Sequence, residues 1–124
     1  WYPSDLMSRA RMDQWLDWVQ CRQSPAVVDV VLNSVFMGDK GDTDAVQRGH
    51  EALIELNSIL ESHLAKSIFL AGEKMTLADL SLASNIYHLG LANAMPKGPA
   101  TMAWYDKLAS LIGYQKSLPE VAAA

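Results

Sequence analysis

Cysteine is nearly missing from this chain, since Cys21 is the only one among 124 residues. A single cysteine cannot close a disulfide within the chain, so a reducing compartment such as the cytoplasm is the expected location. No second cysteine stands near Cys21 in the CxxC arrangement of redox-active sites. We therefore expect Cys21 to be buried as a packing residue rather than to act as a reactive thiol.

Positive charge is also scarce. Ten lysines and arginines stand against 14 aspartates and glutamates, which gives a net charge of −4 and a pI near 5.2. Phosphate binding requires a basic face, so we expect no nucleic-acid partner. The opening residues WYPSD lack the basic start and the apolar centre of a signal peptide. Because the first residue is Trp1 rather than methionine, we expect the chain to be a fragment, an excised domain or a processed product.

The common sequence motifs of metal sites and catalytic sites are absent. His50 and the glutamate after it begin like HExxH, but Ile54 stands where the second histidine would be. Asp39, Asp42 and Asp44 have the wrong spacing for a calcium loop, and no glutamate closes one. Neither a P-loop nor GxGxxG nor GxSxG occurs. We expect no metal site and no catalytic residue in this chain.

Turn-forming residues are few, with seven glycines, five prolines and no Asn-Gly hairpin dipeptide, while half of the residues are hydrophobic. Apolar residues recur instead at spacings of three and four. This pattern predicts one all-α domain over residues 1–124, a bundle of five or six helices. The expected helices cover residues 4–22, 25–37, 43–66, 76–96 and 100–111.

Two details of this prediction depend on local rules. Ser24 followed by Pro25 is typical of a helix start, because proline at the first helical position loses no hydrogen bond. We therefore expect the first two helices to be separate. In the helix over 43–66, the apolar stripe leaves Glu51, Glu55 and Glu61 on the opposite side.

No formally charged side chain occurs from Leu80 to Pro96. A surface helix needs a charged face, whereas a helix surrounded by other helices does not. The serines and asparagines in this stretch make it too polar for a membrane span, so we expect no membrane partner. The sequence thus predicts a central, buried helix that starts near Thr76.

Thr76 and Asp79 stand at the start of this central helix, three residues apart. That spacing is typical of a capping box, in which each side chain accepts a hydrogen bond from the other residue's backbone N–H. Met75 and Leu80 occupy the flanking staple positions. A catalytic role is the alternative, but no histidine or second carboxylate lies close in sequence. We interpret the pair as structural and expect an alanine at either position to cost about 1–2 kcal/mol.

Along the helix over 4–22, one stripe mixes residue types that rarely share a face: Met7, Arg11, Gln14 and Trp18. A core stripe would exclude the arginine, and a solvent-facing stripe would not need the tryptophan. The combination suits the wall of a cleft or an interface.

These stretches resemble the C-terminal helical domain of the glutathione transferase family. FLAGEKMTLADLSLA (69–83) is similar to the N-capping box of that domain, YPSDLMSRARMDQWLDW (2–18) to its linker and first helix, and AWYDKLAS (103–110) to a late helix. The match covers essentially the whole chain. Each motif is weak alone, and the combination is specific.

The resemblance implies a complete enzyme with a thioredoxin-like domain upstream, absent from this chain, that binds glutathione and activates its sulfur. Tyr2 would then be a linker residue. The helical domain would supply the wall for a hydrophobic electrophile, for which Met7, Arg11, Gln14 and Trp18 are the candidates, and part of a homodimer interface. Asp13 resembles the aspartate that approaches glutathione from the opposite subunit. Glutathione would be a co-substrate, with no further cofactor.

A second function remains open. Similar helical domains act as non-catalytic interaction modules, as in the gamma subunit of the elongation factor 1 complex or in appendices to aminoacyl-tRNA synthetases. The sequence upstream of Trp1 in the parent gene would separate the two functions.

Overall fold

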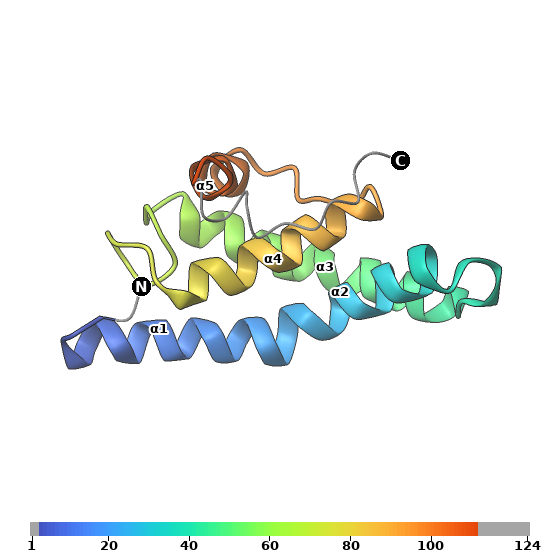
Figure 1. The fold of residues 1–124 in the computed structure, drawn as a ribbon, viewed down its shortest axis with the longest axis horizontal. Helices are drawn as coiled ribbons and strands as arrows, with labels where there is room; N and C mark the ends of the chain where they lie inside the picture. Colours follow the sequence, from blue (N-terminus) through green and yellow to red (C-terminus); the bar gives the residue numbers. More distant parts are fainter. Residues whose placement is uncertain (1–2, 112–124) are drawn as a thin grey trace.

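A computed structural model of the chain describes residues 3–111, so Trp1 and Tyr2 lie outside the described part. The all-α fold is confirmed (Figure 1). Within the described residues the only β pairing is a single bridge between Phe69 and Gly72. The elements are α1 (Leu6–Trp18), the π-turn η1 (Val19–Gln23), α2 (Ser24–Val31), the π-turn η2 (Leu32–Phe36), the short η3 (Gly38–Lys40), α3 (Thr43–Leu64), α4 (Leu77–Leu91) and α5 (Pro99–Ala109).

The first two expected helices form one continuous rod, so the prediction of separate helices at Ser24 is wrong. Ser24 has helical φ and ψ of −59° and −44°, and its N–H bonds to the carbonyl of Val19 in a π-turn. Pro25 would normally break a helix, because it lacks an N–H and its ring crowds the preceding turn. The π-turn η1 ends two residues before Pro25, and such turns accommodate a local disruption of the helical hydrogen-bond pattern. The Ser24 hydroxyl accepts a hydrogen bond from Asn85 of α4.

Helix α4 lies at the centre of the bundle and contacts α1, η1, α2 and α5. In Figure 1 it runs between the α1–α2 rod below and α5 above. Its inward face is completely buried and consists of Ala78, Asp79, Leu82, Ala83, Ile86 and Leu89. The opposite face reaches the surface at Leu77, Ser84 and Leu91. The absence of charge therefore reflects a helix with neighbours on most of its circumference.

The hydrophobic core has two parts. The larger cluster joins the α1 end of the rod to α3, α4 and α5, with Met12, Leu60, Ile86, Trp104 and Leu108 among its members. The smaller cluster joins α2 to α3 and α4 through Val27, Val30, Leu53, Leu56 and Leu89. The half-buried Trp18 packs against both.

Glu61 of α3 forms the N-terminal cap of α5, a role that its position opposite the apolar stripe does not predict. Its carboxylate accepts hydrogen bonds from the backbone N–H of Ala100 and Thr101 and from the Thr101 hydroxyl, each at 2.9 Å. The formal cap residue, Gly98, has no side chain for this purpose. A Cβ at Gly98 would lie 2.1 Å from the Glu61 Oε1 atom, so the glycine leaves the space that the carboxylate occupies.

Glu61→Gln is expected to destabilise the protein by about 1 kcal/mol and to flatten its stability profile in acid. The hydrogen bonds from Thr101, above all from its backbone N–H, hold the pKa of the Glu61 carboxyl below its ordinary value of 4.5. Its stabilisation is therefore fully present above pH 4.5 and is lost as the pH falls through the lowered pKa. Urea unfolding at several pH values measures this loss. Glu51→Gln, on the exposed side of α3, is the control; equal pH slopes for parent and Glu61→Gln would contradict the assignment.

Candidate functional site

The N-terminus of α4 is fixed by Thr76 and Asp79, which are 2% and 0% exposed. Both halves of the capping box are present. The Asp79 Oδ2 atom accepts from the Thr76 N–H at 2.9 Å, and the Thr76 hydroxyl accepts from the Ala78 N–H at 3.3 Å. Met75 and Leu80 are half-buried and both pack on the larger core cluster. Met75 before the cap residue and Leu80 in the first turn thereby fix the direction in which the chain enters α4.

Asp79 also makes two contacts outside the capping box. Its Oδ1 atom accepts the indole N–H of Trp104 in α5 at 2.8 Å and the backbone N–H of Leu70 at 3.0 Å. One carboxylate thus connects α4, α5 and the loop between α3 and α4. No local sequence pattern shows these two donors, because they lie 25 and 9 residues away.

The loop between α3 and α4 is held in a defined shape. The Leu70 carbonyl meets the His63 Nε2 atom of α3 at 2.7 Å, and the His63 ring packs on Trp15 of α1 with centroids 4.4 Å apart. Phe69 and Gly72 bond to each other through both backbone groups. Gly72 has a φ of +139°, a value that side-chain-bearing residues rarely adopt. The loop therefore presents residues 71–76 as a wall that faces the start of α1.

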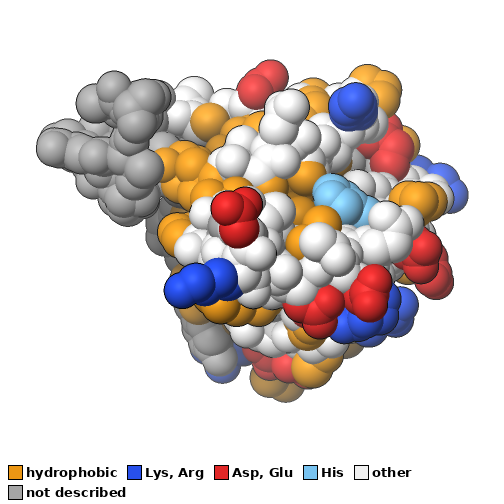
Figure 2. Space-filling model, turned by 90° about the vertical axis from the view of Figure 1, so that its right-hand side faces the viewer, with side chains coloured by type: hydrophobic (Ala, Val, Ile, Leu, Met, Phe, Trp, Pro, Cys, Tyr) orange, Lys and Arg blue, Asp and Glu red, His pale blue; other side chains and the backbone are white. Residues whose placement is uncertain are grey.

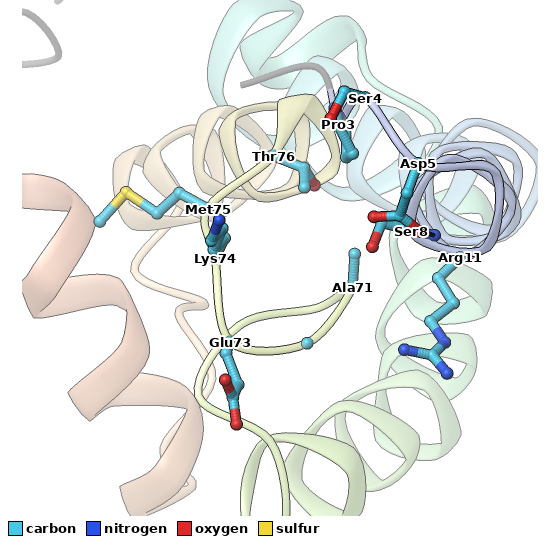
Figure 3. Close-up of a pocket in the computed structure, with 11 residues that line it drawn as sticks. Pro3, Ser4, Asp5, Ser8, Arg11, Ala71, Glu73, Lys74, Met75 and Thr76 are labelled. Carbon is cyan, nitrogen blue, oxygen red and sulfur yellow. Dashed lines mark hydrogen bonds between the residues drawn. The ribbon is translucent and has the colours of Figure 1, made fainter.

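A groove of about 620 Å³ separates this loop wall from α1 (Figure 3). The loop side consists of residues 71–76. The other side is formed by Pro3, Ser4, Asp5, Ser8 and Arg11. Figure 3 shows Asp5, Ser8 and Arg11 on the α1 side of the opening and Glu73 on the loop opposite. The groove combines three apolar residues, Pro3, Ala71 and Met75, with two cations, two anions and several hydroxyl groups.

Asp5 and Arg11 set the charge on the α1 side of the groove. Asp5 is the N-cap of α1 and accepts the Ser8 N–H at 2.9 Å. The side-chain and backbone hydrogen bonds from Ser8 hold the pKa of the Asp5 carboxyl below its ordinary value of 3.8, and the charge of Arg11 adds a smaller effect in the same direction. Asp5 is thus an anion at neutral pH. The groove can hold a small molecule that carries groups of both charges.

The structure separates the four residues of the mixed stripe. Arg11 lines the groove and also a neighbouring hollow of about 420 Å³ between α1 and the end of α3. Gln14 lines the second hollow only. Met7 is 65% exposed near the start of the rod, and Trp18 is half-buried against the core with its ring 5.4 Å from that of Trp15. Arg11 and Gln14 are therefore the members of the stripe that reach a concave surface.

Other candidates from the sequence lie elsewhere. Asp13 is exposed on α1 and lines neither hollow. Cys21 is exposed, so the expectation that it packs in the interior is wrong; it belongs to the π-turn η1, on the outer side of the rod. In the described part of the chain, no three histidine, cysteine or acidic side chains gather as metal ligands do. None of the helices described here has the length and hydropathy needed to cross a bilayer.

Exposed apolar side chains cluster at the two ends of the long rod. Leu6 and Met7 project from the start of α1, beside the groove. Val28, Leu32 and Val35 form an exposed stripe on α2 and η2, and Phe36 and Met37 continue it. Figure 2 views the molecule from the end where η2 and η3 lie, and hydrophobic side chains are visible there among scattered charges.

The sequence of this chain matches a known protein family. Residues 43–107 match the model of the glutathione S-transferase C-terminal domain. The chain is 30% identical over 118 residues to glutathione S-transferase F10 of Arabidopsis thaliana, with 90% of this chain and 55% of the relative aligned. It is 30% identical over 120 residues to glutathione S-transferase theta-1 of Mus musculus, covering 91% of this chain and 50% of that one.

Solved structures agree with the family match. The theta class glutathione S-transferase from Xanthomonas axonopodis pv. citri superposes with a TM-score of 0.82 at 26% identity, over 93% of this chain and 63% of the other. The chain spans about half the length of the curated relatives it matches. On the matched family model, this chain belongs to the glutathione S-transferase C-terminal domain family.

Proposed function

We propose that this chain is the electrophile-binding half of a cytoplasmic glutathione transferase whose upstream, thioredoxin-like domain binds glutathione. The observation that carries the proposal is the groove along α1, whose two walls are the start of the first helix and the loop before α4. The relatives that align with the chain are named glutathione S-transferases and are about twice its length. The expected location in the cytoplasm rests on the single, unpaired Cys21.

In the proposed reaction, the thiolate of glutathione attacks an electrophilic carbon and the leaving group departs as an anion. A carbon–sulfur bond forms, the bond to the leaving group breaks, and the thiol proton passes to the upstream domain or to solvent. This chain would contribute position and charge. Arg11 would attract the leaving anion, the apolar residues of the groove would hold the electrophile, and both contributions would act on the transition state.

The proposed roles of the four residues in the mixed stripe follow from their positions. Arg11 and Gln14 would contact the electrophile, because Arg11 lines both the groove and the neighbouring hollow and Gln14 lines that hollow. Met7 would extend the apolar surface towards the upstream domain, since it is exposed at the start of the rod. Trp18 would hold α1 in place against the core, because it packs against both hydrophobic clusters.

Arg11→Ala in the complete protein is expected to lower kcat/KM for an aryl halide about 10-fold, which corresponds to about 1.4 kcal/mol of transition-state stabilisation. Arg11 is exposed, so the unfolding midpoint should not change. Arg48→Ala is the matched control, because Arg48 is also exposed but lies on α3 away from both hollows. Equal kcat/KM values for parent and Arg11→Ala would exclude Arg11 from the electrophile site.

Asp13 belongs to the same proposal through a homodimer, in which its carboxylate would meet the ammonium of glutathione bound to the opposite subunit. Its exposure on α1 leaves it accessible to a second copy. Asp13→Asn is expected to raise KM for glutathione several-fold while KM for the electrophile stays the same. Asp17→Asn, also exposed on α1, is the control. A complete protein that does not conjugate glutathione to any aryl halide would favour the non-catalytic interaction module.

A further inference from the structure

Three buried side-chain atoms, which belong to two amides inside the bundle, lack a hydrogen-bond partner among the described residues. Gln23 is 0% exposed, and neither its Nε2 nor its Oε1 atom makes a hydrogen bond to another described residue. The Oδ1 atom of Asn57 in α3 is likewise buried and without such a bond. Buried amides in native proteins nearly always have hydrogen-bond partners, from the protein or from ordered water.

The two amides lie at nearly the same position along the helix axes, which we call the same level of the bundle. Arg22 of η1 meets Glu55 of α3 at 4.0 Å, and the ring of Trp15 lies 4.4 Å from that of His63. In this antiparallel register Asn57 stands opposite residues 20–21 of the rod. With a rise of about 1.5 Å per residue, that position is only about 3–5 Å along the axis from Gln23. η1 contacts both α3 and α4.

This level also separates the two hydrophobic clusters. Val19 belongs to the larger cluster, whereas Ala26 and Val27 belong to the smaller one, and Gln23 lies between them in the chain. Two side-chain hydrogen bonds cross from the rod to α4 at the same level: Gln20 to Ser81 and Asn85 to Ser24. The Gln23 amide and the Asn57 Oδ1 atom are thus the parts of this polar layer that lack a hydrogen-bond partner among the described residues. Pro25 also has no backbone N–H, so it cannot donate a hydrogen bond to a carbonyl of the preceding turn, and that carbonyl needs another donor.

We propose that this layer contains an internal hydration site, in which a bound water molecule bridges the Gln23 amide and the Asn57 Oδ1 atom. A buried water usually makes about three hydrogen bonds to groups that the protein leaves unpaired, and the two atoms of the Gln23 amide with the Asn57 oxygen provide that number. The water would satisfy the amides at the point where the rod continues through Pro25.

A high-resolution crystal structure of the chain tests the site directly. The expected result is an ordered water at about 2.7–3.2 Å from both the Gln23 amide and the Asn57 Oδ1 atom. Absence of such a water, or a direct hydrogen bond between the two side chains, would overturn the proposal. This readout requires no variant.

Substitutions provide a second, independent readout. Gln23→Met keeps the side-chain length but removes both polar atoms, so the water and Asn57 lose a partner and the urea midpoint should fall. Gln23→Met combined with Asn57→Leu should lower the midpoint by less than the two single changes added together, because no unpaired amide remains. Gln20→Met, whose hydrogen bond to Ser81 is exposed, is the control and should retain the water. A Gln23→Met protein with a midpoint above that of the parent would contradict the site.

Discussion

Asp79→Ala is expected to destabilise the domain by about 3–5 kcal/mol, because three buried N–H donors lose their acceptor at roughly 1–3 kcal/mol each and water can enter part of the space. The donors are the backbone N–H groups of Leu70 and Thr76 and the indole N–H of Trp104. This loss is larger than the 1–2 kcal/mol that a capping box alone predicts. Urea unfolding followed by circular dichroism measures it.

Two further variants show whether the buried contacts cause the loss. Asp79→Asn keeps the shape but replaces one oxygen with an NH₂ group, which cannot accept from a neighbouring donor, so an intermediate loss of about 1–3 kcal/mol is expected. Asp17→Ala removes an exposed carboxylate and should change stability by less than about 0.5 kcal/mol. If Asp79→Ala costs as little as Asp17→Ala, then the contacts to Leu70 and Trp104 carry no energy.

Trp104→Ala is expected to cost about 3–5 kcal/mol as well, since it removes an indole that is only 2% exposed and opens a cavity between α4 and α5. Trp104→Phe keeps much of the ring but loses the N–H. It should cost less than Trp104→Ala, because the Asp79 Oδ1 atom still accepts from Leu70. The same urea melts measure both variants.

A double-mutant cycle separates the hydrogen bond from the packing. Trp104→Phe and Asp79→Asn should show a coupling free energy of about 0.5–3 kcal/mol, as contacting residues do. Strictly additive losses would mean that the 2.8 Å contact contributes nothing beyond burial. The cycle thereby tests whether the late helix α5 is attached to α4 through this carboxylate.

The sequence was sufficient for features that depend on near neighbours. The Thr76–Asp79 spacing, the uncharged stretch after it and the stripe of α3 each reflect helical periodicity or a backbone N–H within one turn. The all-α fold and the central place of α4 follow from these local patterns.

Features that depend on distant partners could not be predicted in the same way. Glu61 stands on the polar side of α3 by periodicity, yet α5, which begins 38 residues later, brings its unpaired N–H groups to that carboxylate. Pro25 has the sequence of a helix start, but η1 before it lets the rod continue. Arg11 was identified by its unusual stripe. The opposite wall of its groove depends on Gly72, His63 and Asp79 together, which no single pattern reveals.

Hydrogen exchange by NMR tests the central claim most directly, namely that α4 is the buried helix around which the bundle is organised. We predict that the backbone amides of Leu82, Ile86 and Leu89 exchange only through global unfolding, with a protection free energy equal to that from urea melts. Amides of the exposed turn η2 should exchange much sooner. If the α4 amides exchange as fast as those of η2, then α4 does not form the core of this domain.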